Sequence, residues 1–293
     1  MIATTEIRRP ALRYYGGKWK LAPWIISHFP DHKNYVEPCG GAASVLLQKP
    51  RSPLETYNDL DGNVVNFFQV LRDRPDELIH KIRLTPWARA EYELCREPDL
   101  DPIENARRFF ACGWMSISGM AFEMSTGWRA TTFDGQSFTP HLYQYQYTQD
   151  ILQKISDRLL SVQIENKNAS YVIERYDNKD TVIYFDPPYM AETRSQSNQY
   201  LIETDDTFHT EAAALLRSAL GYVVVSGYAC PLYTELYEAH DWSRFDKEAQ
   251  TNSGGKRIES LWLSPRTVEA LQKPRQVPMF SSSPAGGLTP RPK

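Results

Sequence analysis

An apolar run that ends in two prolines limits what this chain can fold into. Residues Thr181–Phe185 are continuously apolar or β-branched, and Asp186, Pro187, Pro188 and Tyr189 follow directly. Such a run is typical of a buried strand in a parallel sheet. The two prolines donate no backbone hydrogen bonds and hold φ near about −65°, so the chain must leave the sheet here. The sequence therefore predicts an α/β fold with Asp186 at the carboxyl end of a strand, where open α/β sheets bind ligands.

The chemistry of this turn suits a flat ligand that carries an amino group. The carboxylate of Asp186 and the carbonyls of the proline turn can accept N–H hydrogen bonds, and the ring of Tyr189 can stack on a base. An ordinary strand-ending turn could contain the same four residues, so the rest of the chain has to decide between the two interpretations.

Composition and charge narrow the class of protein. The chain has 293 residues, 41% hydrophobic and 24% charged, which is ordinary for a globular protein of one large or two modest domains. No apolar stretch approaches the roughly 18 residues that span a bilayer, and the N-terminus lacks the apolar core of a signal peptide, so we expect a cytoplasmic protein. The four cysteines lie far apart without a CxxC pair, so we expect no metal site and no disulfide framework.

The net charge of −3 does not by itself indicate a nucleic-acid-binding protein. However, residues 1–33 hold six basic and two acidic side chains, and the last 21 residues hold four basic side chains and no acid. Local basic surfaces of this kind can contact phosphates, although a mixed solvated surface would have the same composition.

The order of apolar segments predicts one α/β domain with an insertion. We expect helices over 22–29, 42–48, 63–72, 151–159 and 210–220, and strands over 35–36, 54–57, 181–185, 222–226, 242–249 and 258–263. Residues 1–84 and 149–272 would form the two parts of the domain, and 85–148, rich in aromatic residues, Arg and Gly, would be inserted between them. Residues 273–293, rich in Pro, Ser and Gly, predict a disordered tail.

A glycine loop follows the first expected strand. Glu37 and Pro38 precede Gly40 and Gly41, which let a ligand approach the backbone. Asp59 follows Gly41 by 18 residues, close to the spacing of about 20 at which an acidic side chain accepts hydrogen bonds from ribose hydroxyls. The loop is not GxGxxG, so it does not specifically indicate a dinucleotide, and a tight turn with an N-capping Asp is the alternative.

Taken in order, these segments resemble the Dam-like family of N6-adenine-specific DNA methyltransferases. The resemblance covers roughly residues 12–265 and lies in 14–18, 35–45, 58–59, 186–189 and 256–262. Three positions depart from the family pattern. Cys39 stands where family members usually carry an aromatic residue, Ala43 where they carry glycine, and Tyr14 where they carry tryptophan.

This resemblance implies a fold, a cofactor and a set of roles. The fold would be a Rossmann-like methyltransferase sheet with helices on both faces and an inserted, mostly helical DNA-recognition segment. The protein would bind S-adenosylmethionine, flip an adenine out of double-stranded DNA at a short specific site such as GATC, and methylate its N6 as a monomer without a metal, with or without a companion restriction enzyme. The catalytic residues would be Asp186, Pro187, Pro188 and Tyr189. The cofactor-binding residues would be Tyr14, Lys18, Glu37, Pro38, Gly41, Asp59 and Asp186. Candidate DNA contacts are Arg107, Arg108 and Arg129.

Other functions remain open at this point. A methyltransferase of the same fold could act on cytosine N4, on RNA or on a protein glutamine amide, although Asp at position 186 favours adenine by family resemblance. A nucleotide-dependent oxidoreductase would need a fuller glycine fingerprint and would leave residues 186–189 unexplained. The intact catalytic turn also disfavours a DNA-binding protein without activity.

Overall fold

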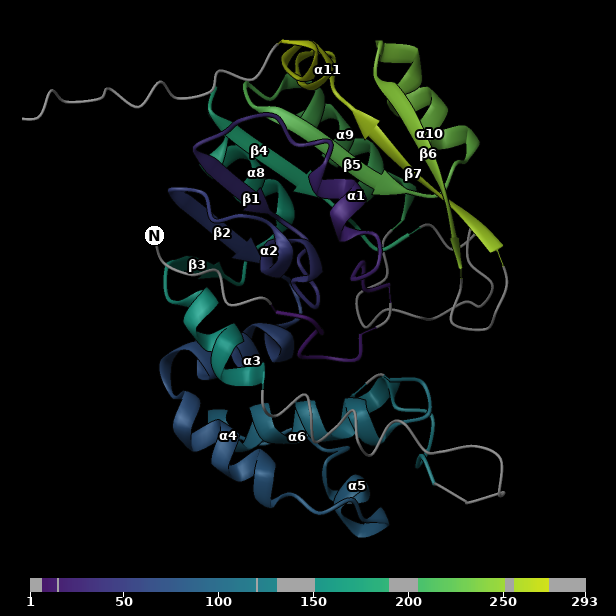
Figure 1. The fold of residues 1–293 in the computed structure, drawn as a ribbon. Coiled ribbons are helices and arrows are strands. Elements are labelled where there is room, and N and C mark those ends of the chain that lie inside the picture. Colours follow the sequence, from purple (N-terminus) through teal and green to yellow (C-terminus); the bar gives the residue numbers. More distant parts are fainter. Residues whose placement is uncertain are drawn as a thin grey trace, which may run out of the picture.

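A seven-stranded mixed sheet forms the centre of the protein, with strand order β3-β2-β1-β4-β5-β7-β6 (Figure 1). The computed structural model describes residues 7–14, 16–119, 121–130, 151–189, 205–250 and 256–273. The strands are β1 Asn34–Glu37, β2 Leu54–Asn58, β3 Val162–Glu165, β4 Thr181–Phe185, β5 Tyr222–Gly227, β6 Ser243–Gln250 and β7 Lys256–Leu263. Strands β1 to β5 are parallel, and β7 pairs antiparallel with both β5 and β6. This order confirms the predicted Rossmann-like methyltransferase sheet.

Helices cover both faces of the sheet. The α-helices of the described residues are α1 Ala22–Ile26, α2 Ser44–Gln48, α3 Gly62–Asp73, α4 Pro75–Leu84, α5 Arg89–Leu94, α6 Pro102–Met115, α8 Ala169–Tyr176, α9 Asp206–Ser218, α10 Pro231–Leu236 and α11 Pro265–Gln272, and residues 151–159 are also helical. Alternate residues of β4 enter different cores. Val182 and Tyr184 belong to the core on the α1, α2 and α3 side, while Ile183 and Phe185 belong to the core on the α8, α9 and α10 side. A strand buried on both faces needs a continuous apolar run, which is what the sequence has here.

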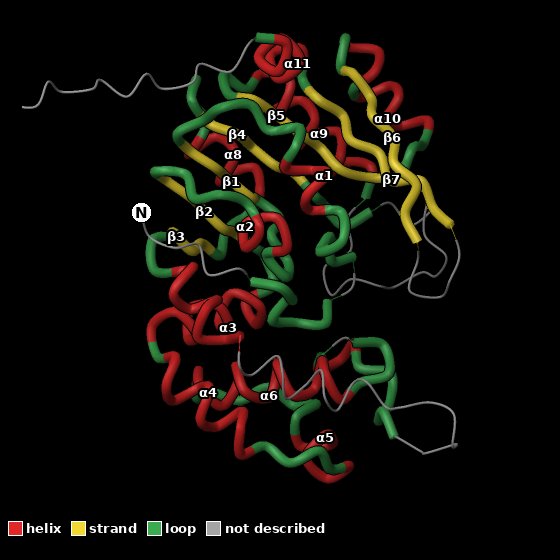
Figure 2. The backbone as a smooth tube through the Cα atoms, viewed as in Figure 1, coloured by secondary structure: helices red, strands yellow, loops and turns green. Residues whose placement is uncertain are grey.

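The segments α4, α5 and α6 lie together beyond the β3 end of the sheet (Figure 2). Helix α6 begins at its N-cap Asp101, whose carboxylate accepts a hydrogen bond from the Glu104 backbone N–H. The rings of Phe67 in α3 and Phe110 in α6 stack with centroids 5.9 Å apart, so the helical layer shares a core with the sheet. The described part of the insertion is mostly helical, as predicted. The domain boundaries stay a prediction, because α4, which precedes residue 85, packs on α6.

Several expectations fall outside the described residues. These are the later part of the predicted insertion, 131–148, and nearly all of the predicted tail, 274–293. Among the helices that the structure describes, none has the length and hydropathy needed to cross a membrane.

Candidate active site

A cavity of about 420 Å³ opens at the carboxyl ends of β1, β2 and β4. Strand β1 lies between β2 and β4, so chain connections run in opposite directions from it and leave a crevice at this edge. The cavity is lined by residues 14, 16–18, 37–42, 44–45, 59–61, 168–169, 184, 186–188, 205 and 208. It therefore brings together all seven predicted cofactor-binding residues and three of the four predicted catalytic residues.

Two tyrosine rings fix the glycine loop after β1. A Cβ on Gly40 would come within 2.2 Å of the Tyr57 ring, and one on Gly41 within 2.9 Å of the Tyr14 ring. Gly41 also has a positive φ of 46°, which favours glycine. Its N–H donates to Asp59 Oδ2 at 2.8 Å, and Tyr57 donates to its carbonyl at 2.6 Å. The loop backbone and the Asp59 carboxylate are thus held as one unit.

Ala43, which stands where family members usually carry glycine, has a left-handed backbone conformation. Ala43 precedes α2 in the left-handed region, with φ 54° and ψ 32°, a conformation that costs a residue with a Cβ about 1 kcal/mol. Glycine at this place would avoid that cost. The Ala43 side chain is fully buried, and of its neighbours Ala42 and Ser44 line the cavity while Ala43 does not. The extra methyl group therefore does not narrow the cavity.

The cavity is strongly acidic. Five of its lining residues are acids, Glu37, Asp59, Asp61, Asp186 and Asp205, and one, Lys18, is basic. Burial raises the pKa of Glu37 to about 8, the nearby Asp186 adds to this shift, and a hydrogen bond from Tyr35 opposes it. Burial also raises the pKa of Asp59 to about 6, against the lowering effect of backbone N–H donors. A ligand with positive charge would relieve both carboxyl groups of this penalty.

Asp186 is oriented by groups from three parts of the chain. Ser226, at the end of β5, donates to Asp186 Oδ1 at 2.6 Å, and Tyr184 in β4 hydrogen-bonds to Ser226 Oγ at 3.0 Å. The ammonium of Lys18 lies 3.1 Å from the same Oδ1 and donates to the Gly16 carbonyl at 2.9 Å. Asp186 therefore has a defined position at the cavity before any ligand binds.

Tyr189 does not line the cavity, unlike the three residues that precede it in the turn. Its side chain is buried. Its hydroxyl donates to Glu259 Oε2 at 3.0 Å, and the ammonium of Lys18 lies 4.4 Å from its ring centroid. Lys18 thus lies between the Asp186 carboxylate and the Tyr189 ring.

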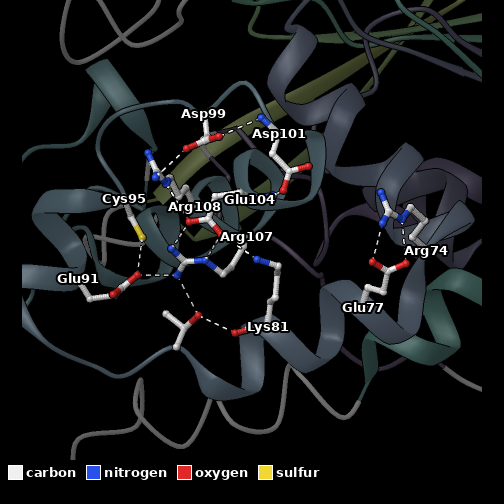
Figure 3. Close-up of polar contacts among 11 residues, drawn as sticks. Arg74, Glu77, Lys81, Glu91, Cys95, Asp99, Asp101, Glu104, Arg107 and Arg108 are labelled. Atoms are coloured by element: carbon white, nitrogen blue, oxygen red, sulfur yellow. Dashed lines mark hydrogen bonds and ion pairs between the residues drawn. The ribbon is translucent and has the colours of Figure 1, made fainter.

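Two of the three candidate DNA contacts, Arg107 and Arg108, pair with carboxylates of the helical layer (Figure 3). Arg107 is buried, and its guanidinium binds Glu91 at 2.5 Å, Glu104 at 2.7 Å and the Thr85 hydroxyl at 3.0 Å. These contacts hold α5 and α6 together and occupy the Arg107 guanidinium, while a role of Arg107 in DNA binding stays a prediction. Arg108 pairs with Asp99 at 2.8 Å and with Glu104.

Arg129 stands beside a second basic residue that sequence reasoning did not select. Arg13 donates to the backbone carbonyl of Ser116 at 3.2 Å. Burial, together with the charge of Arg129, lowers the pKa of Arg13 to about 10. Two neighbouring guanidinium groups repel each other, and an anion placed between them would relieve the repulsion.

Sequence reasoning also missed Ser226, which donates to Asp186 but does not line the cavity, and the lining residues Asn168 and Phe208. The sequence does mark Ser226, because it lies at the end of the apolar β-branched run 222–226, much as Asp186 follows the run 181–185. Asn168 and Phe208 lie at the starts of helices α8 and α9, and no motif marks them. Among the described residues, no group of three His, Cys, Asp or Glu side chains could hold a metal ion.

The strand order, the glycine loop and the Asp-Pro-Pro-Tyr turn beside it define the class of protein as a Rossmann-like methyltransferase. The family model described as D12 class N6 adenine-specific DNA methyltransferase matches residues 14–252, and the chain belongs to this family. The resemblance found in the sequence is thereby confirmed.

Individual relatives are similar at low identity. A DNA adenine methylase of Vibrio cholerae serotype O1 is 33% identical over 78 residues, which is 26% of this chain, and the match spans 27% of that protein's length. The type II methyltransferase M.MjaIII of Methanocaldococcus jannaschii is 21% identical, over 87% of this chain and 96% of its own. A DNA adenine methylase of Salmonella typhi is 24% identical, over 78% of this chain and 84% of its own.

Among solved structures, the rRNA methyltransferase aviRa from Streptomyces viridochromogenes aligns with a TM-score of 0.39 and 14% identity, over 90% of this chain and 89% of its own. The fold assignment rests on the strand order and not on this alignment.

Proposed function

We propose that this protein transfers a methyl group from S-adenosylmethionine to the N6 atom of adenine in double-stranded DNA. The observation that carries the proposal is the shared cavity. The glycine loop after β1, the acid after β2 and the acceptor turn after β4 all line it. A cofactor held by the first two would lie next to a substrate held by the third.

The residues fit this cofactor. Five carboxyl groups against one ammonium suit a ligand with positively charged sulfur and nitrogen, and they disfavour the pyrophosphate of a dinucleotide. Asp59 would accept the ribose hydroxyls, Gly41 and Pro38 would allow close approach, and Glu37 would face the charged part. Tyr14 would flank it. Ser44 Oγ supports the presence of a polar ligand, because it is buried beside the cavity without a hydrogen-bond partner in the described structure.

When bound, S-adenosylmethionine supplies an electrophilic methyl group on a positively charged sulfur. The protein's own task is to prepare the acceptor nitrogen. The lone pair of adenine N6 is delocalised into the ring and attacks poorly. Hydrogen bonds from N6–H to the Asp186 carboxylate and to the Pro187 carbonyl would favour a tetrahedral nitrogen, and Pro188 stiffens the turn that presents them. No strong base is needed, because the proton leaves after the nitrogen has become positively charged.

Entry of the base requires Lys18 to move. An adenine that donates to Asp186 and stacks on Tyr189 would take the place where the Lys18 ammonium now lies, 3.1 Å from Asp186 Oδ1 and 4.4 Å from the ring centroid. N6 of a paired adenine takes part in base pairing, so the base would flip out of the duplex to reach this place. Lys18 stabilises the acidic turn until then.

On the DNA side, we propose Arg129 with Arg13 as phosphate contacts, and Arg108 at the rim of the helical layer. Like charges held close together need an anionic partner, and a DNA phosphate provides one. The relatives named DNA adenine methylases support DNA as the substrate of this chain.

The test is methyl transfer from radiolabelled S-adenosylmethionine to duplex DNA, followed by mass spectrometry of the nucleosides. Wild-type protein should yield N6-methyladenine, and Asp186→Ala should yield none. Asp180→Ala is the matched control, because Asp180 is an exposed carboxylate just before the same strand, paired with Lys33 on the surface, and it should leave transfer unchanged. Transfer that survives Asp186→Ala, or N4-methylcytosine as the product, would refute the proposal. Sequencing of the modified positions gives the recognition site.

A further inference from the structure

Glu259 is a buried carboxylate in the middle of β7, far in sequence from the catalytic turn. It lies opposite Lys247 in the register of β6 and β7, and only 9% of its surface is exposed. It accepts a hydrogen bond from the hydroxyl of Tyr189, which lies 70 residues earlier in the sequence, with the two oxygen atoms 3.0 Å apart. A carboxylate buried at this depth is costly unless it makes such bonds, so this contact is a specific one.

The Tyr189 ring is fixed on further sides. It meets the Tyr228 ring edge to face, with centroids 4.6 Å apart and planes at 71°. Tyr228 in turn accepts a hydrogen bond from Arg257 at 3.3 Å, and the Arg257 guanidinium lies 5.3 Å from its ring centroid. Two side chains of strand β7 thus hold two adjacent aromatic rings: Glu259 contacts Tyr189 and Arg257 contacts Tyr228.

We propose that Glu259 is a positioning residue for methyl transfer, and that it acts by holding the Tyr189 ring at a fixed angle to the Asp186 carboxylate. This proposal rests on the proposed function. The two prolines stiffen the backbone before Tyr189 but leave its side-chain torsions free. The Glu259 hydrogen bond ties the outer end of the ring to the sheet. A base stacked on a fixed ring has its amino group aimed at Asp186, whereas a base on a rotating ring does not.

The test is a double-mutant cycle on the full chain with Tyr189→Phe, Glu259→Ala and both together. Tyr189→Phe keeps the ring and removes the hydroxyl. We expect each single variant to lower kcat about tenfold, because misplacement of a reactant by about 1 Å can cost up to about a hundredfold. KM for S-adenosylmethionine should stay within about twofold of wild type, since neither side chain lines the cavity. The double variant should be no slower than the slower single variant.

Two further variants make the test specific. Glu259→Gln keeps an oxygen acceptor of the same shape and should retain kcat within about threefold, because the hydroxyl of Tyr189 still has a partner. Glu248→Ala removes an exposed carboxylate from the adjacent strand β6 and should have no effect on kcat. Fluorescence of 2-aminopurine at the target position reports stacking, and we expect it to be less quenched in Glu259→Ala than in wild type.

The same cycle in thermal unfolding does not depend on activity. The losses in Tm of the two single variants should not add in the double variant, because both remove the same hydrogen bond. Additive losses in Tm, effects on kcat that multiply, or a Glu259→Gln variant as slow as Glu259→Ala would each overturn the proposal. Absence of methyl transfer by wild-type protein would instead overturn the proposed function and this role with it.

Discussion

Cofactor binding should depend steeply on pH because of one buried carboxyl group. Glu37 lines the cavity, and burial raises its pKa to about 8, so it carries a proton at neutral pH. Asp59, with a pKa near 6 for the same reason, is mostly ionised there. A bound cation favours the ionised form of both groups, so binding expels their protons. Cofactor affinity should therefore fall as pH falls, because lower pH protonates these two groups further in the free protein.

The size of the effect follows from these two pKa values. If both groups are ionised in the complex, Kd falls about 17-fold from pH 6 to pH 7, about ninefold from Glu37 and about twofold from Asp59. At pH 7 binding should release about one proton. The cofactor's own amino group, with an ordinary pKa of about 7.7–8.0, stays protonated over this range. Glu37→Gln keeps the shape of the side chain and removes its titration, so this variant should show only about a twofold change.

Isothermal titration calorimetry measures both quantities. Titrations at pH 7 in buffers of different ionisation enthalpy give the number of protons released, and Kd at pH 6 and pH 7 gives the slope. A wild-type Kd that does not change between these pH values would refute the reasoning. So would a Glu37→Gln variant that keeps the full pH dependence.

Three further outcomes are expected. Ser226→Ala should lower kcat about tenfold with an unchanged Kd for the cofactor, because it removes the 2.6 Å hydrogen bond that orients Asp186; steady-state kinetics decide, and an unchanged kcat would contradict this role. Arg107→Ala should destabilise folding by roughly 2 kcal/mol in urea, because it removes a buried guanidinium that donates to the partly buried carboxylates of Glu91 and Glu104, whereas Arg83→Ala on the exposed face of α4 should change stability by less than about 0.5 kcal/mol. Hydrogen bonds from Arg107 lower the pKa of Glu104 to about 2, so part of the stability present above about pH 4.5 should be lost as pH falls towards 2; equal acid sensitivity in Arg107→Ala would contradict this.

The parallel strands were predictable because burial leaves a strong local mark. Strand β4 has the bounds that its apolar run predicted, and the bounds of β1, β2 and β5 differ from the predicted ones by a residue or two. Strand β3, with its mixed composition of Val162, Gln163, Ile164 and Glu165, carries no such mark. It is a strand because it pairs with β2, and a pairing of that kind is not visible in one segment of sequence.

Helix α6 was missed for the opposite reason. Eleven of its 14 residues are buried, and the polar Asn105 and Arg107 are among them, so burial in this helix does not follow the apolar positions of the sequence. The burial of Arg107 was not predictable from the sequence either. An arginine in an aromatic-rich segment looks like a nucleic-acid contact, and only the fold shows that Glu91 and Glu104 surround it.

The residues of the candidate site also differ in how well the sequence predicts them. Residues that touch the cavity through short motifs, such as Gly41, Asp59 and Asp186, could be identified from spacing. Contacts that depend on the packing of distant strands could not be identified in this way, even where one partner, such as Ser226, ends a recognisable strand. Ser226 reaches Asp186 from β5, and Glu259 reaches Tyr189 from β7, and both distances in sequence exceed what a local pattern can encode.

The position of β1 in the sheet has a consequence for how the chain matures during synthesis. Its first neighbour, β2, begins at Leu54, but its second neighbour, β4, begins only at Thr181. A growing chain therefore holds an open, apolar strand edge while more than a hundred further residues are added. Such an edge invites pairing with other nascent chains, and long-range pairings of this kind form slowly. Production of this protein should accordingly benefit from slow translation at low temperature or from chaperones that shield the incomplete sheet.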